Sequence, residues 1–296
     1  MNLPSSHRQN STVVAKIFVA ALLVFALLPQ GIAARATKPA RPDGPPGLPA
    51  ASGIYNQTNL VSDLPGVALV EDRQLVNPWG VALSSTGPFW VVNNKTDRAT
   101  IYQGDVSGSP LAPNATLPSV AIPNTPTVAS APSLPTGVTA NSTNDFLVSL
   151  TPTSPAMPAQ FIFATLSGGI NAWAANTGST AVVVKFLSGH SYTGIAIGNN
   201  ASGNFLYATD FANGKIDVFD KNFNLASVSG NFTDATIPAN FAPYNIQNLG
   251  GALYVSYAQF QSGFNFDLGF VRKFDTNGVR DAAFAINNGP LVAPWG

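Results

Sequence analysis

The chain has 296 residues, of which only 9% are charged, and its 14 basic and 14 acidic side chains give a formal net charge of zero. Soluble domains carry about 25% charged residues. A neutral chain with so few cations offers no basic surface for a phosphate backbone, which excludes nucleic acid as a partner. The absence of cysteine excludes disulfides, thiolate metal sites and a cysteine nucleophile.

The N-terminus predicts a secretory signal peptide. Arg8 and Lys16 precede an apolar run over residues 17–28, and the small residues 33–36 follow it as a cleavage site. The alternative is a signal anchor, but a helix of this run would cross only about 18 Å of a hydrocarbon core of about 30 Å. We therefore expect a secreted, extracellular protein with no membrane span after cleavage, in the periplasm or at the cell surface if the source is bacterial.

The segment after the signal is typical of a linker, because it is rich in proline, glycine and alanine and has no periodicity. The expected division is a signal peptide at 1–36, a Pro/Gly-rich linker at 37–54 and a folded part at 55–296. In the folded part, short apolar stretches alternate with Gly, Pro, Asn, Ser and Thr, which predicts strands and turns rather than helices.

Six asparagines beyond the signal stand in the N-x-S/T sequence that is glycosylated in the eukaryotic secretory pathway. They are Asn56, Asn94, Asn114, Asn141, Asn200 and Asn231. A chain rich in Asn, Ser and Thr also contains such triplets by chance. They are glycosylation sites only if the source is eukaryotic.

A short motif recurs along the folded part at regular spacing. Its third residue is Gly80, Gly137, Gly194 and Asn245, and a further copy ends at Gly296, so that the intervals are 57, 57, 51 and 51 residues. A proline or tyrosine stands two residues before each of them, and apolar residues follow. Recurrence of one unit at such spacing is the sequence signature of a repeat architecture.

Further apolar stretches follow the motif in the same order in each unit. The second stretches are 89–94, 161–166, 205–210 and 252–257. The third stretches are 99–103, 169–174, 215–220 and 270–275, and a fourth is clearest at 181–187. Four antiparallel strands per unit predict an all-β fold, a β-propeller of four-stranded antiparallel blades, in preference to a β-sandwich or an irregular β-solenoid.

Two stretches carry a family resemblance. Residues 192–220 contain G-I-A, L-Y-x-x-D and I-x-V-F-D in succession and resemble the NHL repeat, a propeller blade, with Tyr192 in place of its proline. Residues 59–104, which begin NLVSD and contain NPWG, resemble the opening of a family of exported NHL-like β-propeller proteins. This second resemblance covers most of residues 59–296 and implies a fold without implying a particular chemistry.

The resemblance also bears on the number of blades. Members of that family continue past the second P-W-G, which implies about six blades, whereas this sequence holds four repeats and the start of a fifth. We expect a propeller that is incomplete at its C-terminus, the alternative being a closed ring of four blades. Residues 58–70 are the candidate for a strand that closes the ring.

The candidate site lies where the motif loops and the ends of the second strands meet around the central channel. The candidate ligand-binding residues on this face are Trp79, Asn93, Asn94, His190, Tyr192, Asp210, Tyr244 and Tyr257. At the strand ends, Asn93, Leu166, Asp210 and Tyr257 align across the four copies, and this position changes character from blade to blade. Such variation indicates local functional demands or, alternatively, a loosely constrained surface.

Several chemistries can be weighed from these residues. Asn93 and Asp210 offer the oxygen ligands that Ca²⁺ prefers, although Glu71 is the only glutamate in the chain. His190 is either a general base or an ordinary loop histidine, and with His7 as the one other histidine a three-histidine zinc site is excluded. The Trp90 and Trp173 side chains fall on strand registers, which favours core packing over carbohydrate stacking.

Three functions remain open. The favoured one is a non-enzymatic exported scaffold that binds a glycan, peptide or protein of unknown identity at the channel face, without a cofactor. The first alternative is a Ca²⁺-dependent hydrolase, lactonase or lyase of the gluconolactonase type. The second is a structural wall or matrix protein with the linker as its stalk. One Asp and one Asn at the channel mouth favour binding, and three or more carboxylates would favour the enzyme.

Overall fold

The computed structural model describes residues 58–83, 87–104, 109–125, 131–259, 269–287 and 294. The chain divides into two compact units, Met1–Tyr55 and Asn56–Gly296, and the fold described below is that of the second unit. The predicted signal peptide and linker, and the sequon at Asn56, lie outside the described residues. No helix within the ranges given above is long and apolar enough to span a membrane.

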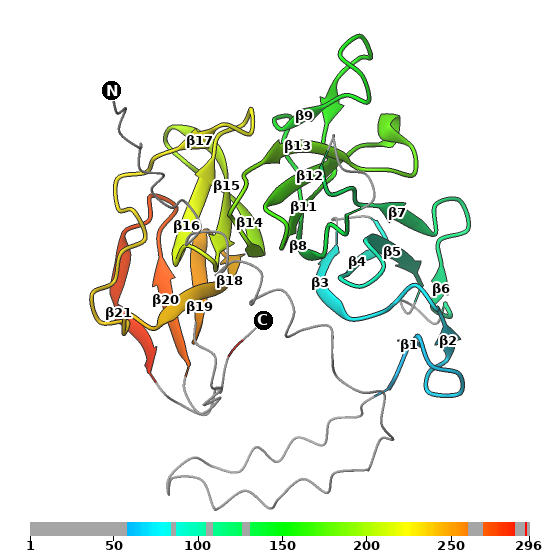
Figure 1. Ribbon diagram of the computed structural model, residues 1–296, viewed down its shortest axis with the longest axis horizontal. Coiled ribbons are helices and arrows are strands. Elements are labelled where there is room, and N and C mark those ends of the chain that lie inside the picture. Colours follow the sequence, from blue (N-terminus) through cyan, green and yellow to red (C-terminus); the bar gives the residue numbers. More distant parts are fainter. Residues whose placement is uncertain are drawn as a thin grey trace, which may run out of the picture. The chain divides into compact units, whose positions relative to one another are not determined.

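The described residues form four successive antiparallel sheets, which Figure 1 shows in chain order from cyan to red. The first sheet contains β3 (Pro78–Leu83), β4 (Phe89–Asn93) and β5 (Arg98–Gln103), with β6 (Ala112–Pro113) and β7 (Ser119–Ala121) both pairing with β5. The second contains β8 (Pro135–Ala140), β11 (Phe161–Thr165), β12 (Gly169–Trp173) and β13 (Val182–Phe186). The third contains β14 (Tyr192–Asn200), β15 (Gly203–Asp210), β16 (Lys215–Phe219) and β17 (Leu225–Ala226). The fourth contains β18 (Phe241–Leu249), β19 (Ala252–Gln259), β20 (Phe270–Phe274) and β21 (Arg280–Asn287).

The first strand of each sheet lies beside the first strand of the next, because β3 contacts β8, β8 contacts β14 and β14 contacts β18. We call these four the inner strands and each sheet a blade. Sheets of four consecutive antiparallel strands that meet through their inner strands are the blades of a β-propeller. The predicted fold class is therefore confirmed, and strands two and three of every blade begin and end within two residues of their predicted positions.

The segment 58–70, which we expected to close the ring, pairs elsewhere. Its β1 (Val61–Ser62) forms a parallel two-stranded sheet with β2 (Val70–Glu71), apart from the four blades. A second small sheet, β9 (Leu147–Val148) with β10 (Met157–Pro158), lies between the first two strands of the second blade in the sequence. The one 3-10 helix among the described residues is η1 (Ala175–Thr177).

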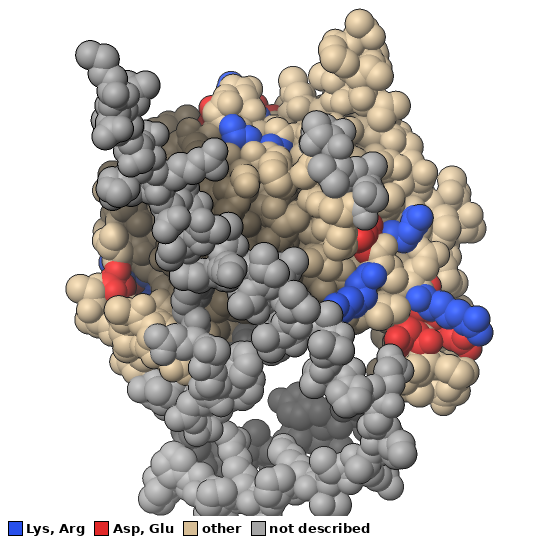
Figure 2. Space-filling model, viewed as in Figure 1, with Lys and Arg blue, Asp and Glu red and all other residues tan. Residues whose placement is uncertain are grey.

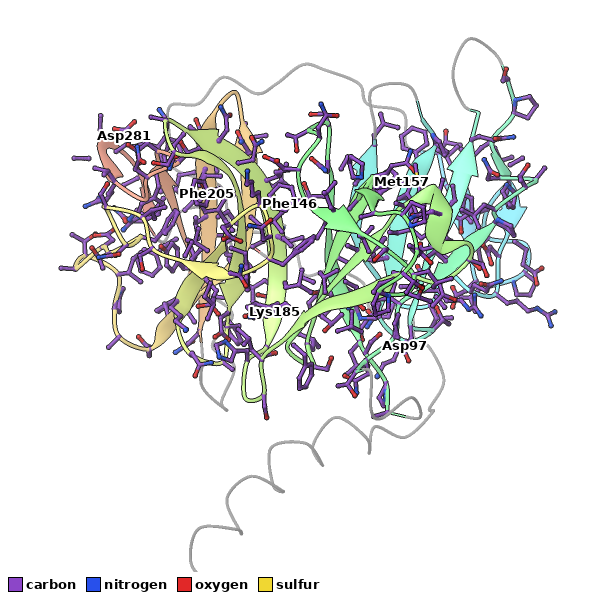
Figure 3. The ribbon with its side chains drawn as sticks, turned by 90° about the horizontal axis from the view of Figure 1, so that it is seen from above. Asp97, Phe146, Met157, Lys185, Phe205 and Asp281 are labelled. Carbon is purple, nitrogen blue, oxygen red and sulfur yellow. The ribbon has the colours of Figure 1, made fainter. Side chains whose placement is uncertain are left out.

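Large apolar side chains fill the spaces between adjacent blades. Between the first two blades, Trp90 stacks on Phe161 with ring centroids 4.2 Å apart and lies 4.8 Å from Trp173, as expected for core residues. Between the second and third blades, Phe146 is fully buried and its ring packs against that of Phe223 (Figure 3). These interfaces explain why the second and third strands of every repeat are rich in apolar residues.

The glycine of the recurring motif lets adjacent inner strands approach closely. A Cβ atom on Gly137 would lie 2.8 Å from the backbone nitrogen of Ile195, and one on Gly194 would lie 2.9 Å from Cα of Asn245. Each glycine thus faces the motif of the next blade. This backbone contact sets the distance between adjacent inner strands, and a side chain in place of the glycine would prevent it.

Hydrogen bonds join each blade to the motif that opens the next one. The Asn94 side chain donates to the carbonyl of Pro135 at 3.3 Å, and the Thr136 hydroxyl donates to the carbonyl of Tyr192 at 2.7 Å. The Thr209 hydroxyl continues the series to the carbonyl of Tyr244 at 2.9 Å. Buried backbone acceptors at the inner strands are therefore satisfied by the preceding blade.

Candidate functional site

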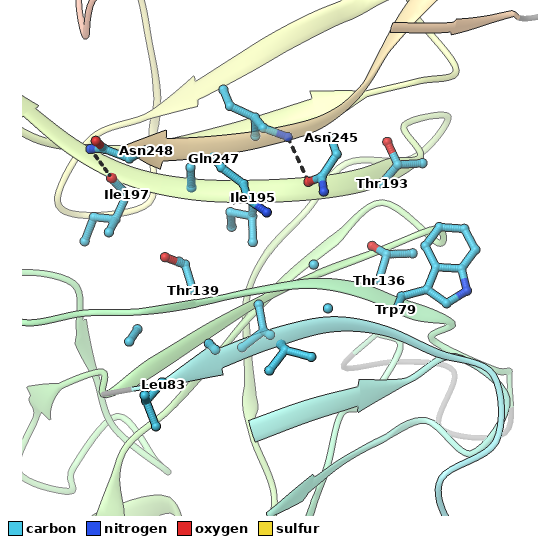
Figure 4. A pocket seen from close by; sticks show the side chains of 18 residues that line it. Trp79, Leu83, Thr136, Thr139, Thr193, Ile195, Ile197, Asn245, Gln247 and Asn248 are labelled. Carbon is cyan, nitrogen blue, oxygen red and sulfur yellow. Dashed lines mark hydrogen bonds between the residues drawn. The ribbon is translucent and has the colours of Figure 1, made fainter. Parts of the chain in front are cut away.

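A groove of about 650 Å³ runs along the inner strands. We use "the groove" for the space lined by Trp79–Leu83, Thr136–Ala140, Thr193, Ile195–Ile197 and Asn245–Asn248 (Figure 4). None of these 18 lining residues has an ionisable side chain. Its walls are the motif glycines, aliphatic side chains, and the hydroxyl and amide groups of threonine, asparagine and glutamine.

The groove presents its polar groups in a fixed arrangement. The Asn248 amide donates to the Ile197 carbonyl at 2.9 Å, and the Asn245 Oδ1 accepts from the Ile246 N–H at 2.8 Å (Figure 4). The Thr139 and Gln247 side chains lie on facing strands of the same close-up. Because two amides are held by the backbone, the groove has preorganised hydrogen-bonding walls.

Aromatic rings gather at the end of the groove where the motifs lie. Trp79 stacks on Tyr244 with centroids 6.0 Å apart, and Phe211 packs edge-on against the same tyrosine at 5.2 Å. Burial raises the pKa of Tyr244 above its ordinary value, so its hydroxyl stays protonated. Trp79 and Tyr244 were predicted to share this face, and Phe211, which follows Asp210 in the sequence, was not singled out.

The strand register places one residue per blade at the end of the second strand. Each of these residues pairs with the first residue of the motif, and they are Asn93, Thr165, Asp210 and Tyr257. Our alignment put Leu166 at this position, whereas the register shift in β11 places Thr165 there. All four residues are buried rather than open to the channel.

Asn93 and Asn94 have structural partners in the first blade. The Asn93 amide donates to the Thr100 hydroxyl at 2.9 Å, and Asn94, which is 4% exposed, bonds to the second blade as described above. Tyr257 is also buried, and burial raises its pKa. These three predicted site residues therefore lie inside the blades and not in the groove.

Asp210 belongs to a polar cluster at the end of the third blade. His190 Nδ1 lies 2.7 Å from Oδ2 of Asp210 and 2.9 Å from Oδ2 of Asp217. We call these three residues the third-blade cluster. The carboxylates are 0% and 6% exposed and the histidine side chain is 19% exposed, so the cluster reaches solvent through the imidazole.

Further side chains surround the third-blade cluster with donors. The Tyr192 hydroxyl donates to Asp217 at 2.8 Å, and burial together with the neighbouring carboxylates raises its pKa, so the hydroxyl keeps its proton. Lys215 bonds the other oxygen of Asp217 at 2.8 Å, and Asn213 donates to Asp210 at 2.7 Å. Tyr192 thus points into its own blade, where we had expected it to face the channel.

The cluster corrects one feature of the sequence-based site. The carboxylate beside Asp210 is Asp217, whereas the sequence suggested Asn93, which lies in another blade. Asp217 sits within the apolar β16, where it pairs with Ala208 across the sheet. A charged residue in the middle of an otherwise apolar strand was the available signal, and we had treated it as part of the repeat pattern.

The sequons differ in accessibility. Among the five within the described residues, only Asn231 is exposed, while Asn94 is buried. Asn114, Asn141 and Asn200 are half-buried, and each uses its side-chain amide in a hydrogen bond. Asn231 is therefore the sequon that can carry a glycan without breaking a contact.

Charged side chains are few on the face drawn in Figure 2, where they form small separate groups among uncharged residues. The distribution agrees with the composition, and the side chains drawn there form no continuous basic surface.

No family model matches this chain. The chain is 32% identical over 259 residues to "Uncharacterized protein R648" of Acanthamoeba polyphaga mimivirus, an alignment covering 78% of this chain and 60% of that protein. It is 31% identical over 290 residues to "Uncharacterized protein L690" of the same virus, covering 85% of this chain and 66% of that protein. The chain thus spans about 60–66% of the length of these relatives.

Among solved structures, the chain is similar to an exo-beta-1,3-galactanase from Phanerochaete chrysosporium, with 14% identity, a TM-score of 0.43, and coverage of 74% of this chain and 51% of that one. It is also similar to virginiamycin B lyase from Staphylococcus aureus, with 12% identity, a TM-score of 0.40, and coverage of 72% and 55%. Likenesses at this level of identity and TM-score are no evidence for a shared chemistry. This chain is a repeat protein of the β-propeller type.

Proposed function

We propose that this chain is an exported binding protein that holds a neutral glycan in the groove. The observation that carries the proposal is the described lining of the groove, which combines hydroxyl and amide groups with the Trp79 indole and includes no ionisable side chain. The indole is backed by Tyr244, on which it stacks. Sugars are bound by stacking of their apolar faces on aromatic rings and by hydrogen bonds to groups of this kind. The volume of about 650 Å³ falls in the range of small-ligand sites.

The absence of charge in the groove distinguishes binding from catalysis there. Hydrolysis of a glycosidic bond requires a pair of carboxyl groups at the reacting atoms, and the groove lining contains none. A charged ligand would leave its hydration shell without gaining a counter-ion. Binding needs no carboxyl pair, and a neutral ligand does not have to give up the hydration of a charge. We therefore favour a binding role over the hydrolase and lyase alternatives.

The proposal predicts that Trp79→Ala weakens glycan binding at least tenfold. The indole forms the stacking surface at the end of the groove, and loss of a central aromatic contact costs about 2 kcal/mol. Neutral oligosaccharides that bind the full chain on a glycan array would be titrated by calorimetry against both proteins. Phe186→Ala is the matched control, because this aromatic side chain is exposed on β13, outside the groove.

Two outcomes would contradict the proposal. One is the absence of any neutral oligosaccharide that binds the chain, and the other is binding that both variants preserve equally. Selective binding of uncharged extended peptides, lost in Trp79→Ala, would retain the groove as the site and replace the glycan by a peptide.

Export is part of the same proposal, and it rests on the signal-like N-terminus. When the chain is expressed with its own leader in a eukaryotic secretory host, we expect it in the medium with a glycan on Asn231. Asn231→Gln should lower the mass by one glycan, as measured by mass spectrometry, because this asparagine is exposed. Asn94→Gln should leave the glycan number unchanged, and a secreted chain glycosylated at Asn94 would contradict the described packing.

A further inference from the structure

The third-blade cluster places three metal-ligating groups at one point. His190 precedes β14, Asp210 ends β15 and Asp217 lies in β16, so consecutive strands of one blade each supply one group. Their ligating atoms all lie within 4.8 Å of one another. Rigid neighbouring strands hold these groups in place, which is the support that a metal site needs.

Both carboxylates direct an oxygen at the same nitrogen, and that nitrogen can carry only one proton. Asp210 Oδ2 and Asp217 Oδ2 lie 2.7 and 2.9 Å from Nδ1 of His190. Nδ1 can therefore donate at most one hydrogen to the two buried carboxylates. Lys215 pairs with the other oxygen of Asp217, and a divalent cation between the three atoms would offset the negative charge that remains at the two Oδ2 atoms.

The other blades show that the fold does not require this charge. The residues at the position of Asp217 are Thr100, Asn171 and Arg272 in the first, second and fourth blades. The first blade uses a neutral Asn93–Thr100 hydrogen bond, and the second has Thr165 with a hydrogen bond from the Gly169 N–H. Two buried carboxylates in the third blade are therefore an addition to the architecture, and burying them has a cost that a ligand would offset.

The surroundings match those of a metal ligand set. Tyr192 and Asn213 donate to the Oδ2 atoms of Asp217 and Asp210, and Lys215 bonds the other oxygen of Asp217, so the carboxylates are oriented by hydrogen bonds as ligands are in known metal sites. The ligand separations of 2.7 and 2.9 Å lie on either side of the edge of an octahedron with bonds of about 2.0 Å, which is roughly 2.8 Å. The partly exposed imidazole leaves positions open to water.

We propose that His190, Asp210 and Asp217 bind a divalent first-row transition metal ion such as Mn²⁺ or Zn²⁺. An imidazole nitrogen together with carboxylates suits these ions, whereas Ca²⁺ takes six to eight oxygen ligands. The site is separate from the groove and independent of its ligand. It lies next to the groove's aromatic end, because Phe211 follows Asp210 and packs on Tyr244.

The test is calorimetric titration of the full chain, stripped with EDTA and dialysed, with MnCl₂, ZnCl₂ and CaCl₂ separately. We expect one Mn²⁺ or Zn²⁺ per chain, with Ca²⁺ at least tenfold weaker. His190→Gln and Asp217→Asn should each weaken binding at least tenfold. The matched control is Asp220→Asn. Asp220 follows the same strand, and the asparagine keeps the side-chain oxygen that accepts hydrogen bonds in the turn. The metal affinity of this variant should be unchanged.

A second measurement needs no variant. The chain has two histidines, so Mn²⁺ added to the unmodified protein should broaden the imidazole NMR signals of His190 and leave those of His7 sharp. Failure of all three ions to bind would overturn the proposal, as would binding that leaves the His190 signals sharp. A melting temperature that rises on protonation of His190 and is indifferent to metal would identify the imidazolium as the counter-ion and would also overturn it.

Discussion

Arg272→Met is expected to lower the free energy of unfolding by about 3 kcal/mol, since it removes the buried partner of Asp234 and leaves only the more exposed Arg280 as its counter-charge. Arg272 is 1% exposed and Asp234, with which it pairs, is 2% exposed. The guanidinium also donates to the Ile286 carbonyl at 3.0 Å and to Asn287 at 2.7 Å. It thereby ties the loop that carries Asp234 to the two outer strands of the fourth blade.

Urea unfolding of the purified chain would measure this loss. Lys273→Met is the matched control, because its pair with Asp281 is accessible to solvent, which screens the charges, and should contribute little to stability. The double variant Arg272→Met with Asp234→Asn should recover part of the loss, because it removes the buried charge. Equal losses of the free energy of unfolding in Arg272→Met and Lys273→Met would contradict the larger contribution of the buried pair.

The same pair predicts an acid dependence. Burial alone would raise the pKa of Asp234, but hydrogen bonds from Thr236 and Arg272 and the charge of Arg272 outweigh it and lower the pKa. The folded-state value lies below the unfolded one, so this stabilisation is complete above about pH 4 and is lost as the pH falls through the folded value. Asp234→Asn should therefore weaken the fall in stability below about pH 4.

Gly137→Ala is expected to cost about 3 kcal/mol, the upper end for inserting a methyl group into a packed interior. All three nearest atoms to the added Cβ belong to the backbone of Gly194 and Ile195, so no side chain can rotate away. Thermal unfolding should show a melting temperature several degrees lower. The control is Gly189→Ala, whose Cβ meets open space and whose cost, at φ +82°, is conformational only.

A cost for Gly137→Ala no larger than for Gly189→Ala would mean that adjacent inner strands can move apart. The groove would then be adaptable in width, and its walls would not be preorganised for a ligand.

The sequence predicted the blades well because the strand pattern is local. Apolar residues such as Phe205 and Leu206 recur in the second stretch of every repeat, and turns at Gly214 and Gly278 have the positive φ that their Asn-Gly sequences favour. The motif glycine was recognised by its spacing alone. Its reason is a contact with the next blade, 57 residues away for Gly137 and Gly194.

The candidate site was predicted less well because it depends on register across strands. Thr165 pairs with Pro135 and holds the position at which Leu166 was expected, and a one-residue shift reverses the side of the sheet. Asp217 pairs with Ala208 and reaches Asp210 only through His190. The charge of Asp217 within its strand was a signal, but the spacing of these residues in the sequence does not show that they meet.

The hydrogen bonds that run from each blade to the next have a consequence for how the protein forms. Within a blade, each strand pairs with strands of its own repeat, so this pairing does not depend on the other repeats. The carbonyl groups that accept from the Asn94, Thr136 and Thr209 side chains lie further along the chain and are synthesised later. Each finished blade thus presents hydrogen-bond donors to the one that follows, and the protein can assemble from its N-terminal side without disulfides to set the order.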